Sequence, residues 1–188
     1  MPQSELLNRA VTVLEGAGIP YMVTGSLASS AQGEPRSTHD IDLVVDLNVG
    51  QINTLLAAFP APEYYLSEAS IQEAIRDRRM FNLLELSTGD KIDFWIVTDD
   101  EYDQTRFARR IKDEIDGIIV DVSTPEDTIL MKLRWAKSSG GSEKQYHDAL
   151  RVYEVQSQLL DTAYMLQWVA KLEVKGLWER IVSEAEPI

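Results

Sequence analysis

Hydrophobic positions in the first part of the chain change their spacing, and each spacing predicts a different element. Apolar residues recur every three or four positions in residues 5–16 (ELLNRAVTVLEG), which predicts a helix with Ser4 as its N-cap and Gly16 at its end. The short apolar run of residues 21–24 (YMVT) predicts a strand. Small residues follow this run, so a second helix is expected to begin at Gly25.

Strands and helices alternate in the middle of the chain. β-branched and apolar residues surround the aspartates of residues 40–47 (DIDLVVDL), which predicts a largely buried strand. Helical spacing follows in residues 49–59 and again in residues 67–79. Apolar runs on both sides of a Ser-Thr-Gly-Asp turn predict a β-hairpin over residues 80–97, and an Asp-Gly turn predicts a second hairpin over residues 109–123.

Helices dominate after this point. Thr124 precedes Pro-Glu-Asp, a combination of N-cap, N1 proline and first-turn acids that starts a helix. Ser142 and Asp161 are predicted to cap the next two helices. The pattern therefore predicts an α/β (mixed α+β) fold, in which residues 1–123 form a core with a mixed β-sheet and flanking helices and residues 124–188 form a C-terminal helical region packed on it.

The composition is that of a folded globular chain. Its 188 residues are 44% hydrophobic and 26% charged, enough to bury a substantial core. Cysteine is absent, which excludes disulfides and thiolate metal sites. The chain has no apolar segment near Met1 and no apolar run of about eighteen residues, so we expect a cytoplasmic protein with no membrane role.

The charge is strongly acidic, with a formal net value of −13. Residues 1–123 hold 10 Lys/Arg against 21 Asp/Glu, whereas residues 124–188 hold 8 against 10. A broad nucleic-acid-binding surface normally carries a basic excess, so the charge weighs against one. Basic residues within 76–79 and 106–112 could meet a polyphosphate or an RNA backbone; alternatively, they balance nearby acids.

Two aspartates in the strand of residues 40–47 carry the most specific chemistry. Residues i and i+2 of a strand project from the same face, so Asp40 and Asp42 point together, with Cα atoms about 6 to 7 Å apart. Two such carboxylates repel each other unless a positive charge lies between them. Mg²⁺, which prefers carboxylate oxygens and keeps sites for water and phosphate, is the natural candidate. The alternative is that one aspartate faces solvent on an edge strand.

Two further features add to this interpretation. Gly25-Ser26 at a strand-to-helix junction could bring backbone N–H groups close to a phosphate, although an ordinary turn would also explain the pair. Asp93 lies among apolar residues of the hairpin. If its strand neighbours that of Asp40 and Asp42, it completes a three-carboxylate cluster that could hold a second metal or accept the proton of an attacking hydroxyl. The alternative is a salt bridge, for example with Lys91.

These residues resemble the motif of the polymerase-beta-type nucleotidyltransferases. That motif is a Gly-Ser or Gly-Gly pair, a spacer, an Asp-x-Asp and a later strand aspartate, which Gly25, Ser26, Asp40, Asp42 and Asp93 match in order. The resemblance implies a nucleotidyltransferase-like sheet core. It also implies Mg²⁺ or Mn²⁺ as the cofactor, held by the three aspartates as metal ligands and catalytic residues.

The segments RSTHDID and PEDTILMKLRWAKSSGGSEKQYHDAL look more specifically like the AbiEii-type minimal nucleotidyltransferases, which are related to type IV toxin–antitoxin systems. This narrower resemblance places Arg36 and Thr38 at the nucleotide. It also associates Lys132 with the triphosphate and Asp148 with the surroundings of the active site.

The resemblance implies transfer of a nucleoside monophosphate from an NTP to an acceptor hydroxyl. The acceptor is open among RNA, a protein and a small molecule, and the acidic charge weighs against RNA. The main alternative is a catalytically inactive member of the same fold that binds a nucleotide or a partner protein in a toxin–antitoxin-like system. Two other enzyme classes use similar short motifs: haloacid-dehalogenase-like phosphatases, which leave the Gly-Ser pair unexplained, and sugar-nucleotide transferases, whose fold needs a longer chain.

Overall fold

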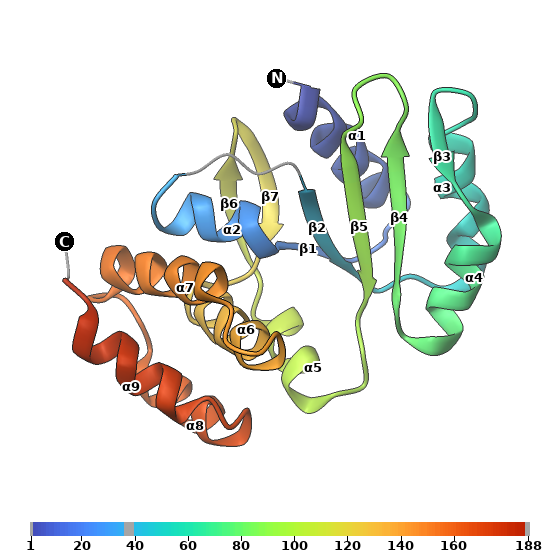
Figure 1. The fold of residues 1–188 in the computed structure, drawn as a ribbon. Helices are drawn as coiled ribbons and strands as arrows, with labels where there is room; N and C mark the ends of the chain where they lie inside the picture. Colours follow the sequence, from blue (N-terminus) through green and yellow to red (C-terminus); the bar gives the residue numbers. More distant parts are fainter. Residues whose placement is uncertain (1, 36–39, 187–188) are drawn as a thin grey trace. The chain divides into compact units, whose positions relative to one another are not determined.

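The computed structural model describes residues 2–35 and 40–186, which divide into two compact units (Figure 1). Unit 1 comprises Met1–Thr24 and Thr38–Val122, and unit 2 comprises Gly25–Ser37 and Ser123–Ile188. The sequence assigns residues 25–35 to the core, whereas in the structure they group with the C-terminal helices. The predicted mixed α/β fold class is confirmed.

In the described residues of unit 1, seven strands form one mixed sheet in the order β3-β4-β5-β2-β1-β7-β6. The pairs β2–β5 and β1–β7 are parallel, and the other four pairs are antiparallel. The strands are β1 (Tyr21–Thr24), β2 (Asp40–Val45), β3 (Tyr64–Leu66), β4 (Met80–Glu85), β5 (Lys91–Ile96), β6 (Ile111–Ile115) and β7 (Ile118–Val122). Both predicted hairpins are present, as the pairs β4–β5 and β6–β7.

The helices of unit 1 pack in series beside this sheet. Helix α1 contacts α3, α3 contacts α4, and α4 lies against β4 and β5. Their bounds are α1 (Pro2–Gly16), a 3₁₀ turn (Val49–Gln51), α3 (Ile52–Ala58), α4 (Glu68–Asp77) and α5 (Glu101–Ala108). The first helix begins before the predicted cap, so Ser4 lies inside it, and its Oγ donates to Asp116 Oδ2 at 3.0 Å instead. Strand β2 ends at Val45, two residues earlier than predicted.

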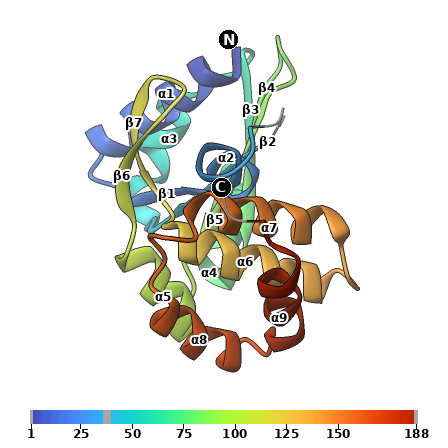
Figure 2. The same ribbon diagram turned by 90° about the vertical axis from the view of Figure 1, so that its left-hand side faces the viewer.

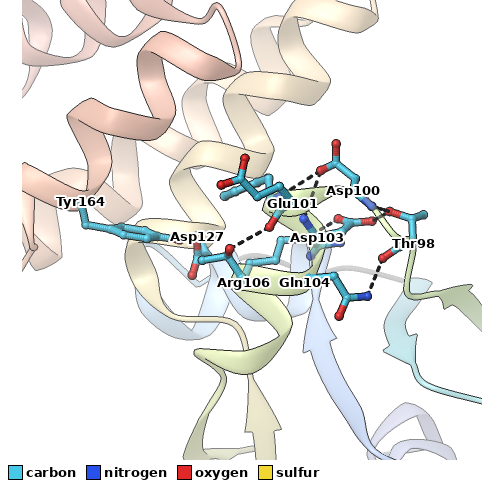
Figure 3. Close-up of polar contacts among 10 residues, drawn as sticks. Thr98, Asp100, Glu101, Asp103, Gln104, Arg106, Asp127 and Tyr164 are labelled. Atoms are coloured by element: carbon cyan, nitrogen blue, oxygen red, sulfur yellow. Dashed lines mark hydrogen bonds and ion pairs between the residues drawn. The ribbon is translucent and has the colours of Figure 1, made fainter.

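Strand β3 and helix α5 are not anticipated from the hydrophobic pattern. Polar contacts hold the start of helix α5 (Figure 3): the Asp100 carboxylate accepts from the backbone N–H groups of residues 102 and 103, at 3.1 and 3.2 Å. Asp103 accepts from Thr98 Oγ1 at 2.5 Å and from Arg106 Nε at 2.7 Å. An N-cap followed by two acids in the first turn is the signal that indicates this helix.

Unit 2 is helical. Helices α6 and α7 pack against each other and α2 packs against both, while α8 contacts α6, and α9 contacts α7 and α8 (Figures 1 and 2). The bounds are α2 (Gly25–Gln32), α6 (Pro125–Ser138), α7 (Glu143–Gln156), α8 (Thr162–Lys171) and α9 (Lys175–Glu184), of which α9 is not anticipated from the sequence. In the described part of the chain, no helix is both long and apolar enough to cross a membrane.

The predicted caps of unit 2 differ in outcome. Thr124 Oγ1 accepts from Asp127 N at 3.3 Å, and Asp161 Oδ1 accepts from Tyr164 N at 2.9 Å, so both are confirmed. Ser142 precedes α7 as predicted, but its side chain makes no capping hydrogen bond. The Tyr164 hydroxyl also donates to Asp127 Oδ1 at 2.6 Å, which ties α8 to the first turn of α6 (Figure 3).

Candidate active site

Four polar side chains form one row across the sheet of unit 1. Asp42 in β2 is in register with Thr24 in β1 on one side and with Asp93 in β5 on the other, and Asp93 is in register with Asn82 in β4. Residues in register project from the same face of a sheet. We call Thr24, Asp42, Asp93 and Asn82 the polar row. The strands of Asp42 and Asp93 are therefore neighbours, as the three-aspartate prediction requires.

The next register position on the same face pairs Asp40 with Lys91. Lys91 Nζ lies 2.9 Å from Asp93 Oδ2 and 3.6 Å from Asp40 Oδ1. The salt bridge between Lys91 and Asp93, the alternative weighed for this aspartate, is therefore present. The hydrogen bond to Asp93 is the main cause that raises the pKa of Lys91, so its ammonium keeps its charge.

Asp93 is the most buried member of the polar row, with 8% of its surface exposed. A carboxylate in such a place is costly unless it is paired. Lys91 supplies charge to one carboxylate oxygen, and Asn82 Nδ2 donates to the other. The sequence does not predict the contact with Asn82. The alternation of β4 indicates only that residue 82 points away from the buried side chains of residues 81 and 83.

Asp42 is half-buried and is held by a tryptophan. Trp95 Nε1 donates to Asp42 Oδ1 at 3.3 Å, while its ring packs against a buried cluster that includes Met22 and Val44. Trp95 belongs to the apolar run around Asp93, which by itself indicates a core position. Its place two residues after Asp93, on the same face of β5, is the signal for the polar contact.

The donor set fits a hard divalent cation. Asp40 and Asp42 offer carboxylate oxygens from one face of β2, and Mg²⁺ is commonly held by one or two carboxylates together with substrate phosphates. Lys91 Nζ, 3.6 Å from Asp40 Oδ1, already places one positive charge beside these carboxylates. Among residues 2–35 and 40–186, no group of three or more His, Cys, Asp or Glu side chains is arranged to hold a metal. The three-aspartate metal site stays a prediction.

The glycine-serine pair opens helix α2 of unit 2, directly after Thr24 of the polar row in the chain. Gly25 has a φ of 67°, a left-handed conformation that favours glycine over residues with a side chain. The Ser26 carbonyl accepts from Ser29 Oγ at 3.1 Å inside the helix. The role of this pair toward phosphate stays a prediction. Arg36 and Thr38 lie outside the described residues.

Lys132 and Asp148 meet inside unit 2. Lys132 Nζ in α6 lies 2.7 Å from Asp148 Oδ2 in α7, and their side chains are 4% and 9% exposed. The structure therefore brings together the two residues that the narrower resemblance associates with the nucleotide. Their roles toward a triphosphate stay predictions.

Basic residues in both segments, 76–79 and 106–112, have acidic partners. Arg76 pairs with Asp77 at 2.8 Å, Arg106 pairs with Asp103 at 2.7 Å, and Lys112 lies 3.2 Å from Asp121 Oδ1. These contacts favour the alternative that the basic groups balance nearby acids.

Comparisons with known proteins identify the fold. No protein-family model and no curated protein matches the chain. Among solved structures, ANT(2'')-Ia in complex with adenylyl-2''-tobramycin is 15% identical with a TM-score of 0.59, over 93% of this chain and 99% of that one. The solution structure of the antibiotic-resistance factor ANT(2'')-Ia is 15% identical with a TM-score of 0.53, over 97% and 94%.

An antigenic nucleotidyltransferase-like protein from Paracoccidioides brasiliensis is 16% identical with a TM-score of 0.56, over 100% of this chain and 95% of that one. At sequence identities of 15 to 16%, the likeness to these structures shows the fold of the chain and nothing further. The narrower resemblance to the AbiEii-type proteins stays a prediction. The chain has the nucleotidyltransferase fold.

Proposed function

We propose that the protein is a metal-dependent nucleotidyltransferase that moves a nucleoside monophosphate from an NTP to an acceptor hydroxyl. The observation that carries this proposal is the register of Asp42 with Asp93, which gives a chain of this fold two carboxylates on one face of neighbouring strands. The AbiEii-like resemblance is a narrower form of the same proposal.

Asp40 and Asp42 would hold Mg²⁺ or Mn²⁺, with Asp93 beside them. When bound, the cation would orient the triphosphate and offset its negative charge. The backbone N–H groups at Gly25 and Ser26 would receive phosphate oxygens at the start of α2. Lys132 and Asp148 complete the proposed nucleotide-binding set, together with Arg36 and Thr38.

The reaction needs a group that takes the proton of the acceptor hydroxyl. Asp93 can do so because each carboxylate oxygen has two lone pairs, and Lys91 and Asn82 each occupy one. The acceptor oxygen forms a bond to the α-phosphorus as the bond from that phosphorus to the bridging oxygen breaks. The proton passes to Asp93 and pyrophosphate leaves.

The net charge of the chain narrows the choice of acceptor compound. A chain with a formal charge of −13 repels polyanions and attracts cations over several ångströms of solvent. We therefore favour a small, neutral or cationic hydroxyl compound over RNA as the acceptor.

Transfer of α-labelled ATP, GTP, CTP and UTP, with Mg²⁺ or Mn²⁺, to small-molecule extract, total RNA and cell protein tests the proposal. Asp42→Asn keeps the shape of the side chain and an oxygen for Trp95 but removes the charge, so transfer should fall at least about a hundredfold with an unchanged melting temperature. Asp46→Asn, at an exposed aspartate just beyond β2, is the matched control and should keep full activity. Full activity of a folded Asp42→Asn protein would remove the assignment.

One observation favours a second candidate, an inactive member of the fold that binds nucleotide or a partner protein. Both oxygens of Asp93 already accept hydrogen bonds, so an acceptor hydroxyl would compete with Lys91 and Asn82 for this carboxylate. A rise in melting temperature with NTP and Mg²⁺, without any labelled product, would support this candidate.

A further inference from the structure

Lys91 is an internal cation at the edge of the polar row. Its ammonium contacts carboxylates on two neighbouring strands, Asp93 Oδ2 at 2.9 Å and Asp40 Oδ1 at 3.6 Å. Its side chain is 35% exposed, so the ammonium lies at the boundary between the buried aspartate and solvent. The acidic face of the sheet is thus partly neutralised by the chain itself.

A divalent cation at Asp40 and Asp42 would meet this ammonium. Like charges repel at short range, and a carboxylate oxygen that accepts from an ammonium has fewer lone pairs for a metal. The same ammonium already contacts the third carboxylate of the predicted cluster, that of Asp93.

We propose that Lys91 is the built-in counter-ion of this site and competes with the divalent cation for Asp93 and Asp40. Lys91 is a positioning residue on this view: it holds the Asp93 carboxylate in place in the metal-free protein, and it would move from the carboxylates on metal binding. The inference rests on the proposed metal site. It states that Lys91, a residue outside the aspartate motif, sets how tightly the metal binds.

The test is Mn²⁺ binding to the nucleotide-free protein. Binding is measured as the loss of the electron paramagnetic resonance signal of free Mn²⁺. Lys91→Met should bind Mn²⁺ at least about tenfold more tightly than wild type. Lys91→Arg keeps the positive charge and should bind as weakly as wild type. Lys91→Gln removes the charge but can still donate to Asp93, so it replaces the methionine variant if that protein does not fold.

Lys112→Met is the matched control for the change in net charge. Lys112 Nζ also lies between two carboxylates, at 3.3 Å from Glu15 and 3.2 Å from Asp121. It lies on β6, three strands from β2 in the sheet order, which is about 14 Å by strand spacing. Because this exceeds the Debye length of about 8 Å at physiological ionic strength, Mn²⁺ affinity should stay within about twofold of wild type.

The outcomes separate this inference from the proposed function. Mn²⁺ binding by wild type that Asp42→Asn abolishes supports the metal site, whatever Lys91 does. If Lys91→Met and Lys91→Gln then bind no more tightly than Lys112→Met, the inference is wrong and the metal site stands. If Mn²⁺ binds only after the Lys91 charge is removed, the result supports both the metal site and the role of Lys91. If Mn²⁺ binds to no variant, both are wrong.

Discussion

Single buried charges are stabilised in the same way in both units. In unit 1 the Asp93 carboxylate is satisfied by Lys91 and Asn82, and in unit 2 the Lys132 ammonium is satisfied by Asp148. A charge that leaves water loses several kcal/mol of solvation, which only a close partner offsets. The Asn82–Asp93 hydrogen bond joins β4 with β5 in the first unit, and the Lys132–Asp148 pair joins α6 with α7 in the second. Polar residues with proposed catalytic roles therefore also contribute to the stability of each unit.

The pair in unit 2 gives a prediction for stability. Lys132→Met leaves the Asp148 carboxylate buried without its ammonium, so the free energy of unfolding in urea should fall by about 3 to 5 kcal/mol. Lys137→Met, on the same helix, breaks an ion pair with Glu173 whose side chains are 45% and 80% exposed, and should cost less than about 1 kcal/mol. Equal losses in the two variants would contradict this account.

The double variant Lys132→Met with Asp148→Leu tests whether the cost comes from an unpaired charge. The double variant removes both charges of this pair together, so it should be more stable than the sum of the single changes implies. Additive losses would indicate that the two side chains contribute independently.

Residue chemistry was partly predictable from the sequence. The apolar surroundings of Asp93 indicate that it needs a positive partner, and Lys91 two residues earlier is on the same face of β5. Asn82 and Trp95 are different cases. Their contacts depend on which strands are neighbours and in which register, and the hydrophobic pattern of one strand carries no information on its partner.

Terminal signals predicted several elements, whereas β3 and α5 were not anticipated, each for its own reason. The turns at 87–90 and 116–117 fix the two hairpins, and Thr124 with the proline after it fixes the start of α6. Strand β3 has only three residues, too few for alternation to be visible. Helix α5 has low apolar content, so its capping residues rather than its periodicity define it.

Contact between α2 and α7 depends on a glycine. A Cβ at Gly33, just after α2, would lie 2.9 Å from Val152 N and 3.0 Å from the carbonyl carbon of Arg151, both backbone atoms of α7. Real Cβ atoms essentially never come so close, so a larger residue would force the two helices apart. The small side chains of α2 are thus matched to a close helix contact within unit 2.

Gly33→Ala should therefore lower the free energy of unfolding by about 1 to 3 kcal/mol, measured in urea. Gly176→Ala is the matched control in α9, where an added Cβ meets nothing within 4 Å. That change should stabilise the protein by up to about 1 kcal/mol, because alanine favours a helix more than glycine does. A neutral Gly33→Ala variant would show that α2 and α7 can separate without cost.

The fold class of the whole chain follows from local patterns, but its candidate site depends on distant pairing. Asp42 and Asp93 are 51 positions apart in the sequence and meet because β2 and β5 are parallel neighbours. The hydrophobic pattern identifies each of the two strands, but it does not show that they are neighbours in the sheet. The resemblance to a known motif supplied the link, and the sheet order of unit 1 confirms that the two strands adjoin.

Each unit also contains a buried tyrosine whose pKa is raised above its ordinary value, mainly by burial. In unit 1 the Tyr21 hydroxyl donates to Glu15 Oε1 at 3.1 Å and accepts from Asp121 N at 3.2 Å, and its pKa lies far above the usual range. In unit 2 the Tyr146 hydroxyl donates to Glu184 Oε2 at 2.9 Å, and burial raises its pKa to about 12. Deprotonation of either residue opposes folding.

The stability of the whole molecule should consequently fall in alkali. An unfolded tyrosine loses its proton near pH 10, whereas folded Tyr146 keeps it until about pH 12, so its contribution is complete below pH 10 and is lost as the pH rises to 12. The free energy of unfolding in urea, measured from pH 8 to 12, should show this decline. In Tyr146→Phe the total loss over this pH range should be smaller by about 2 kcal/mol. Tyr65→Phe, at an exposed tyrosine of β3, should keep the wild-type slope. A Tyr146→Phe protein with that same slope would show that this hydroxyl titrates alike in the folded and unfolded chains.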